Sequence, residues 1–177
     1  MADNVSQHNQ EIINKLKEVE IFRVFARNDK VIGKIAKLCK LKTFKKGQVI
    51  IEEGEFGDEL FIFLNGTIDI LKKTLQNEKY TVTTLDADKK SIHVGELALI
   101  DNDRRSATVI AQSDCRCLVM KRDAFIAFGN ENPDIGLVVT RVIASQISMM
   151  LRKATSDVIT LFSALVEEIS ETESADQ

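Results

Sequence analysis

The middle of the chain, from about residue 41 to residue 120, consists of short β-prone runs separated by glycines. Runs rich in Val, Ile, Phe, Thr and Tyr occupy 48–51, 59–64, 67–73, 79–85, 106–111 and 115–120. Asn65-Gly66 joins two of them and is typical of a tight β-hairpin. In the run 79–85, Tyr80, Val82 and Thr84 alternate and are expected on one face. Many short strands with regular turns predict a mainly β fold, a jelly roll or a barrel.

Helical periodicity precedes these strands. Apolar residues recur every three or four positions over 10–19 and again over 28–38, which predicts two short amphipathic helices. Asn28-Asp29 offers an N-cap for the second helix. Residues 1–9 are polar, and we expect them to be disordered.

Helical periodicity also returns after Lys121. A short helix is expected over 122–128, ending at Gly129, and Pro133 begins another that reaches about Ile169. Apolar residues follow there in heptad spacing: Ile147, Leu151, Ala154, Val158, Leu161 and Leu165. Such a helix is about 50 Å long, more than a domain of this size can cover. We therefore favour a homodimer, with packing on the barrel or closure over a ligand as alternatives.

Two charged residues, Glu96 and Arg105, flank a short apolar turn nine positions apart. Gly95 allows close approach to the backbone, and 97–100 predict one helical turn whose first N–H groups face an anion. The planar fork of arginine matches a phosphodiester, while an ionised glutamate accepts from a sugar hydroxyl. One small ligand with both groups satisfies both residues. A structural ion pair between the two is the simpler alternative.

The segment 95–109, Gly-Glu-Leu-Ala-Leu-Ile followed by Arg-Ser-Ala-Thr-Val, resembles the phosphate-binding cassette of the cyclic nucleotide-binding domain. That family includes regulatory subunits of cyclic-AMP-dependent protein kinase, nucleotide-gated channels and bacterial catabolite-activator regulators. Segments 46–50 and 53–62 are similar to its turns and strands, so the resemblance covers roughly 44–128. It implies an eight-stranded β-roll (a double-stranded β-helix or jelly roll) with N-terminal helices and a long C-terminal helix.

The resemblance also implies roles for single residues. The cassette glutamate of the family binds the ribose 2′-hydroxyl and the arginine binds the cyclic phosphate, positions that Glu96 and Arg105 match. The implied ligand-binding set is Gly95, Glu96, Leu97, Ala98, Arg105, Ser106 and Ala107, with Val82 and Val94 stacking on the purine. The implied ligand is a cyclic nucleotide, without a metal.

Two features distinguish this cassette. The segment 101–104, Asp-Asn-Asp-Arg, replaces one that often has proline before the key arginine, and its acids are expected to reduce affinity modestly. Ser106 follows the arginine, where a hydroxyl is linked to cyclic GMP preference in the kinase branch but contacts the phosphate in bacterial regulators. Because 133–135 resemble the catabolite-activator branch, we expect cyclic AMP (cAMP), with cyclic GMP (cGMP) as the alternative.

The expected organisation has four parts. Residues 1–40 form a tail and helical segment, and 41–128 form the β-roll, whose cassette spans 94–109. Residues 129–170 form the C-terminal helix, and 171–177 an acidic tail. The eleven residues from Glu167 onward hold five acids and are expected to fray.

Composition limits the remaining functions. The net charge of the chain is −3, but residues 1–46 hold eleven Lys or Arg against five acids. We interpret these basic residues as the solvent-exposed faces of the predicted helices. The three cysteines are not spaced as metal ligands. We expect them to be small buried residues of a cytoplasmic protein. No run approaches the length of a membrane span, and no secretory signal is expected.

An enzyme and a DNA-binding regulator are the rival classes. His8 is expected in the tail and His93 at a strand end on the surface, so no metal or catalytic cluster is predicted. Only about ten residues follow Glu167, so we expect no winged-helix module after the long helix. We therefore expect a stand-alone cAMP sensor that signals to an unknown protein partner through its C-terminal helix. The alternatives are a cGMP-selective sensor or a degenerate module that dimerises without a ligand.

Overall fold

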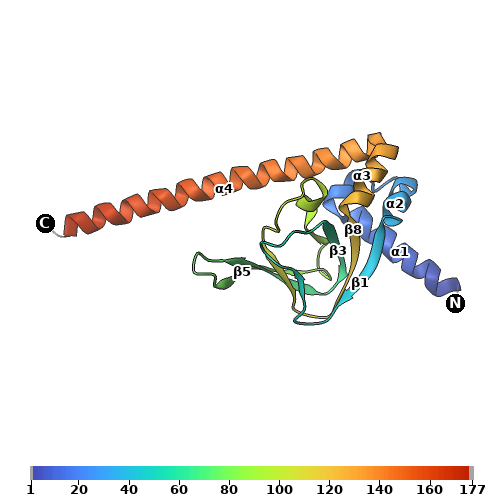
Figure 1. Ribbon diagram of the computed structural model, residues 1–177, viewed down its shortest axis with the longest axis horizontal. Coiled ribbons are helices and arrows are strands. Elements are labelled where there is room, and N and C mark those ends of the chain that lie inside the picture. Colours follow the sequence, from blue (N-terminus) through green and yellow to red (C-terminus); the bar gives the residue numbers. More distant parts are fainter. Residues whose placement is uncertain (1, 176–177) are drawn as a thin grey trace. The chain divides into compact units, whose positions relative to one another are not determined.

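The computed structural model describes residues 2–175, with side chains for 9–169. In this part of the chain, eight antiparallel strands form two four-stranded sheets flanked by helices (Figure 1). The strand orders are β1-β8-β3-β6 and β2-β7-β4-β5. The strands are β1 (Cys39–Phe44), β2 (Val49–Ile51), β3 (Glu59–Asn65), β4 (Thr67–Lys73), β5 (Lys79–Asp86), β6 (Ile92–Val94), β7 (Thr108–Ala111) and β8 (Cys115–Lys121). The predicted β-roll is confirmed.

The helices lie before, within and after the strands. They are α1 (Ala2–Glu18), η1 (Glu20–Phe25), α2 (Asp29–Ala36), η2 (Glu96–Leu99), α3 (Arg122–Glu131) and α4 (Pro133–Ala175), where η marks a 3₁₀ helix. The predicted cap is present, because the Asn28 side chain accepts a hydrogen bond from the Val31 amide at 3.2 Å. Pro133 begins α4 as predicted, whereas α3 continues through Gly129 to Glu131.

The expectation that residues 1–9 are disordered is wrong for residues 2–9, which belong to α1. Its later turn is anchored by Leu16, which is fully buried. Once a helix is nucleated, each further residue adds a hydrogen bond, so polar residues can extend it. Residue 1 and the side chain of His8 lie outside the described part.

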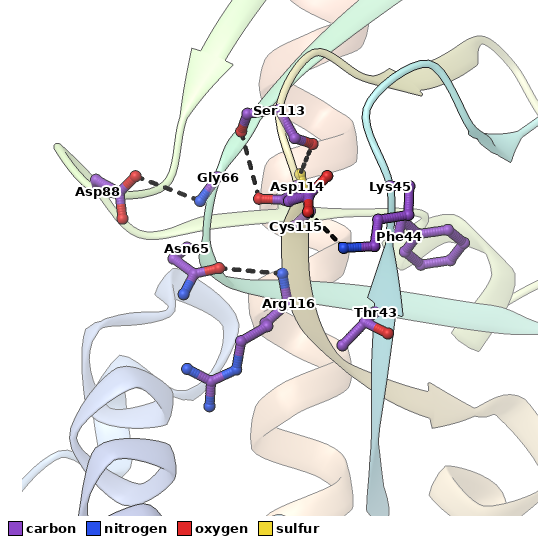
Figure 2. A pocket seen from close by; sticks show the side chains of 10 residues that line it. All are labelled: Thr43, Phe44, Lys45, Asn65, Gly66, Asp88, Ser113, Asp114, Cys115 and Arg116. Atoms are coloured by element: carbon purple, nitrogen blue, oxygen red, sulfur yellow. Dashed lines mark hydrogen bonds and ion pairs between the residues drawn. The ribbon is translucent and has the colours of Figure 1, made fainter.

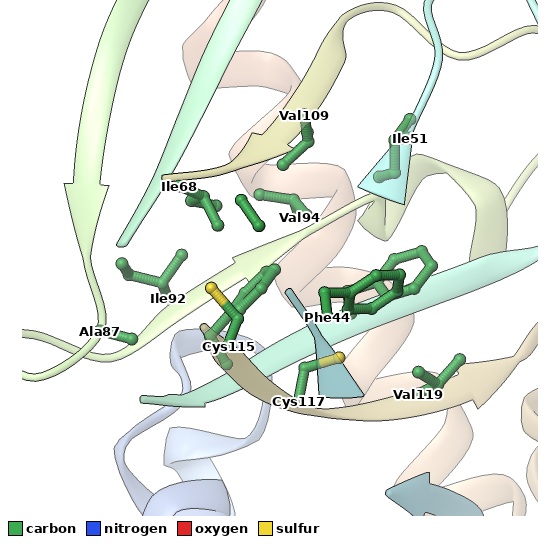
Figure 3. Close-up of a cluster of buried hydrophobic side chains, with 13 residues drawn as sticks. Phe44, Ile51, Ile68, Ala87, Ile92, Val94, Val109, Cys115, Cys117 and Val119 are labelled. Atoms are coloured by element: carbon green, nitrogen blue, oxygen red, sulfur yellow. The ribbon is translucent and has the colours of Figure 1, made fainter. Parts of the chain in front are cut away.

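The core fills the space between the two sheets (Figure 3). Alternate residues of each strand point inward, as Phe61 and Phe63 do on β3. Phe44 packs edge to face on Phe61, with ring centroids 6.2 Å apart. Cys115 and Cys117 belong to this core, and their thiols are free, which confirms that they act as small buried residues.

Asn65-Gly66 does not form the predicted hairpin. β3 and β4, which it connects, belong to different sheets and do not pair with each other. Gly66 has φ +96°, and a Cβ there would lie 2.6 Å from the Cys115 sulfur. The dipeptide therefore turns the chain from one sheet into the other, a geometry that local sequence does not distinguish from a hairpin.

A β-bulge in β5 overturns the expected face of Tyr80, Val82 and Thr84. Thr83 lies opposite Ile70 but Thr81 lies opposite Leu71, so Val82 is the extra residue. Residues opposite each other share a face, which puts Thr83 on the inner side with Ile70. Val82 remains 53% exposed.

Contacts divide the chain into two compact units, residues 1–140 and 141–177. α4 belongs to both and has 43 residues, so it is about 64 Å long and extends beyond the expected end near Ile169. The expected fraying from Glu167 onward is not seen up to Ala175. Four of the predicted heptad residues are strongly exposed: Leu151, Val158, Leu161 and Leu165.

One helical stretch, Pro133–Ile169, is long and apolar enough to cross a membrane by length and composition alone, and its most apolar 18-residue window has a mean hydropathy of 1.4. This differs from the expectation that no run approaches a span. The unbroken apolar runs of this stretch are short, because Ser, Thr, Gln and seven charged residues interrupt it. Of the most apolar window, 28% is buried.

Candidate functional site

Arg105 is held at the end of the cassette by its own backbone. Its amide donates to the Glu55 carbonyl at 2.8 Å, and its carbonyl accepts from the Gly54 amide at 2.9 Å. The side chain then donates from Nη2 to the Glu59 backbone carbonyl at 2.7 Å. The backbone and one side-chain N–H are therefore fixed, while the guanidinium keeps further donors for a ligand.

Two glycines make room for this guanidinium. A Cβ on Gly57 would lie 2.3 Å from Arg105 Nε, and one on Gly95 would lie 2.6 Å from Nη1. Gly95 also has φ +82°, a conformation that L side chains rarely adopt. Any larger residue at either position would displace the charged group.

The charge of Arg105 has no ion-pair partner among the described residues, since its one side-chain hydrogen bond goes to a backbone carbonyl. Burial lowers the pKa of the guanidinium, and the negative charges of Glu59, Asp58 and Glu96 oppose that shift. Arginine remains protonated at any physiological pH. A partly buried cation without a bonded counter-ion favours the binding of an anion.

A cavity of about 210 Å³ opens beside Arg105. Six of the predicted site residues line it: Val94, Gly95, Glu96, Arg105, Ser106 and Ala107. Glu96 begins η2, the helical turn expected one residue later. The cavity thus has a carboxylate and a guanidinium on its wall, as a ligand with a hydroxyl and a phosphate requires.

Three predicted residues are not brought to this cavity. Leu97 and Ala98 belong to η2, where Ala98 is 5% exposed, and neither of them lines the cavity. Val82 is directed outward by the bulge in β5. In the hairpin of β4 and β5, it is Ile70 that lines the cavity.

Sequence reasoning missed four lining residues. Three are apolar, namely Ile51, Ile70 and Val109, and together with Val94 they form an apolar wall. Ile70 could have been predicted from its position two residues after Ile68 in the same strand, because such residues share a face and Ile68 is fully buried. The fourth is His93, which was expected on the surface.

His93 borders the cavity and is half-buried. Burial lowers its pKa, and the charges of Glu96 and Glu20 oppose the shift. Burial disfavours a charged imidazole. The ring is therefore mainly neutral at pH 7.

A second and larger cavity, about 530 Å³, lies at the ends of β1, β3 and β8 (Figure 2). Its cations already have carboxylate partners. Lys45 contacts Asp114 at 2.6 Å, and Arg116 contacts Glu11 at 3.2 Å. No group of three metal-ligating side chains is found among the described residues.

Comparison with known proteins identifies the fold and the family. The family model of the cyclic nucleotide-binding domain matches residues 41–132. The chain is 32% identical to mouse cGMP-dependent protein kinase 2 over 127 residues, which is 71% of this chain and 16% of that kinase. It is 42% identical to the cGMP-dependent protein kinase of Toxoplasma gondii over 86 residues, 49% of this chain and 8% of that one. The chain thus spans a small part of these relatives.

Solved structures show the same fold. A cyclic nucleotide-binding domain from Methylobacillus flagellatus superposes with a TM-score of 0.69 at 20% identity, covering 83% of this chain and 80% of that one. The cAMP-bound structure of PfPKA-R gives 0.60 at 30% identity, covering 68% and 41%. Because the family model covers half of the sequence and the cavity lies within the matched residues, the chain belongs to the cyclic nucleotide-binding domain family.

Proposed function

We propose that this protein is a cAMP receptor in which Arg105 binds the cyclic phosphate and Glu96 binds a ribose hydroxyl. One observation carries the proposal. The guanidinium of Arg105 lies between two glycines, is bonded to no carboxylate in the described part of the chain, and faces the same cavity as Glu96. The phosphate supplies the missing counter-ion.

The ligand's other groups have matching surroundings. The wall of Ile51, Ile70, Val94 and Val109 suits the apolar faces of a purine. The cavity is smaller than the ~300 Å³ at which small-molecule sites usually begin. A bound nucleotide therefore extends beyond it, and its base requires a further cover that forms on binding.

The preference for cAMP over cGMP is the less constrained part of the proposal. The cAMP-bound PfPKA-R at 30% identity supports cAMP. A cGMP receptor is the second candidate, since the Ser106 hydroxyl lines the cavity and the relatives named above are cGMP-dependent kinases. The two differ in whether the Ser106 hydroxyl bonds the base or the phosphate.

We further propose that α4 carries the signal. Its apolar side chains from Leu151 to Ile169 are exposed, a surface suited to another protein or to a second copy of the chain. Nucleotide binding would shift the population of α4 conformations and so control that contact. In this proposal the protein acts as a sensor and as a homodimer. Its three free cysteines support a cytoplasmic location.

Calorimetric titration of cAMP and cGMP into the nucleotide-free protein tests the receptor. We expect saturable binding, with cAMP the tighter ligand. Glu96→Ala should weaken binding of the parent nucleotide but not of its 2′-deoxy form, because the lost contact is to that hydroxyl. Absence of binding by both nucleotides would identify a degenerate module that acts through α4 alone.

Analytical ultracentrifugation with and without nucleotide tests the output. A dimer that changes its association on binding supports signalling through α4. A monomer in both states at micromolar concentration would contradict the homodimer and leave the receptor proposal intact.

A further inference from the structure

The residue before Arg105 takes part in an unusual set of contacts. Arg104 and Phe56 form an isolated antiparallel β-bridge, next to the two backbone bonds that tie Arg105 to Gly54 and Glu55. The end of the cassette and the loop 54–57 are thus joined like a very short pair of strands. The same loop contributes Gly57, one wall of the space that holds the Arg105 guanidinium.

The Arg104 side chain reinforces this pairing. Its Nη1 donates to the Gly54 carbonyl at 2.6 Å, and its guanidinium carbon lies 4.8 Å from the centroid of the Phe56 ring. Phe56 is 65% exposed and Arg104 is also exposed. An exposed aromatic ring is here covered by a cation, a favourable arrangement. The guanidinium of Arg104 therefore contacts the same short loop at two places, the Gly54 carbonyl and the Phe56 ring.

We propose that Arg104 is a positioning residue for nucleotide binding, which fixes Arg105 by clamping the loop 54–57. The inference rests on the proposed role of Arg105. A Cβ on Gly57 would overlap the Arg105 guanidinium, so loop 54–57 packs closely against this group and a shift of the loop changes the space that it occupies. Arg104 itself does not line the cavity, because its Nη1 donates to the Gly54 carbonyl and its guanidinium lies over the Phe56 ring.

A double-mutant cycle on cAMP affinity separates positioning from simple attraction of the phosphate. Arg104→Ala is expected to weaken binding about 5- to 30-fold, the combined effect of a charge-assisted hydrogen bond and an exposed cation–π contact. In an Arg105→Lys background, the same change should have little further effect, because the planar fork that Arg104 positions is gone. Phe56→Leu keeps all charges and should still weaken binding about 2- to 5-fold.

Amide hydrogen exchange of the nucleotide-free protein gives a readout without a ligand. Arg104→Ala should speed exchange at Gly54 and Arg105, whose amides make the two bonds of the short pairing. Arg27→Ala, a change of another exposed arginine in the loop before α2, should alter neither exchange nor affinity.

Equal losses from Arg104→Ala in both backgrounds would show that Arg104 acts through its own charge and would overturn the proposal. Unchanged exchange at Gly54 and Arg105 would overturn it as well. If the unmodified protein binds neither cAMP nor cGMP, the proposed function itself fails. Faster exchange in the variant would still show the clamp.

Discussion

The two cavities of the β-roll differ in whether their cations are paired with carboxylates, and this difference does not follow their sizes. The larger one, about 530 Å³, is rich in charge, but its Lys45 and Arg116 are paired with Asp114 and Glu11. The smaller one, about 210 Å³, contains Arg105, whose side chain, among the described residues, is bonded only to a backbone carbonyl. The volume of a cavity limits the size of its ligand, whereas a cation without a bonded counter-ion attracts an anionic ligand.

The surroundings of the two cations explain the difference. Lys45 and Asp114 are mostly exposed, so water and each other already satisfy them. Arg105 is partly removed from water, and burial lowers its pKa. An anion at Arg105 offsets that unfavourable desolvation, whereas an anion at Lys45 must displace Asp114. We therefore assign the nucleotide to the smaller cavity.

The largest expected effect tests this assignment directly. Arg105→Ala should weaken cAMP binding by about 30-fold to several thousand-fold, because it removes one member of a buried charged pair. Lys45→Ala should leave affinity within about twofold. Calorimetry on both folded variants measures the contrast. Comparable losses of affinity from the two substitutions would contradict the assignment of the nucleotide phosphate to the smaller cavity.

A glycine substitution gives the next largest effect. The methyl of Gly57→Ala would overlap Arg105 Nε, and we expect about 5- to 150-fold weaker cAMP binding from the displaced guanidinium. Gly33→Ala is the matched control, because a Cβ there meets no atom within 4 Å. Retained affinity in Gly57→Ala would mean that the space around Arg105 is less restrictive than its geometry indicates.

Local sequence was sufficient to predict the cassette side of this cavity. Gly95, Glu96 and Arg105 lie within eleven residues of one another and are joined by η2 and the short loop that follows it, and all three line the same cavity. Six of the eight strands were also predicted from alternation and glycine positions, whereas β1 and β6 were not. These features depend on neighbours along the chain.

The remaining parts depend on pairing between distant segments. Val82 was expected at the purine, but the bulge that turns it outward is defined by the register of β5 on β4. Asn65-Gly66 was expected to close a hairpin, yet β3 pairs with β6 and β8 instead. His93 was expected on the surface, and its place at the cavity follows from the pairing of β6 with β3. None of these pairings has a local signature.

At the larger cavity, a glycine substitution should change stability and not affinity. A Cβ on Gly66 would lie 2.6 Å from the Cys115 sulfur and 2.7 Å from the Asp114 carbonyl oxygen, at φ +96°. Gly66→Ala should lower the free energy of unfolding by about 1–3 kcal/mol, measured by urea denaturation. Gly47→Ala has a similar φ of +84° but no close neighbour, so it isolates the backbone contribution and should cost less.

In the folded fraction of Gly66→Ala, nucleotide affinity should equal that of the parent protein. A specific loss of affinity at unchanged stability would indicate that the larger cavity takes part in binding. That result would remove the distinction between the two cavities that the charges suggest.

The smallest expected effect is on the free energy of unfolding at acidic pH. The two cavities are expected to affect it over different pH ranges. Burial lowers the pKa of His93 from 6.5, so the unfolded chain binds its proton more readily than the folded protein does. The stability that neutral His93 permits is thus present above pH 6.5 and is lost as the pH falls below it. Asp114 at the other cavity behaves differently, since its bond from Lys45 lowers its pKa from 3.8. Its contribution is lost only at pH values below that.

Urea denaturation between pH 7 and pH 5 therefore reports on the smaller cavity. His93→Gln should flatten the decline of the unfolding free energy over this range, because glutamine cannot be protonated there, whereas Asp114→Asn should not change its slope. His8 is common to both variants and cancels from the comparison. An unchanged slope in His93→Gln would mean that the imidazole titrates as it does in water. The electrostatic contrast between the two cavities would then rest on Arg105 alone.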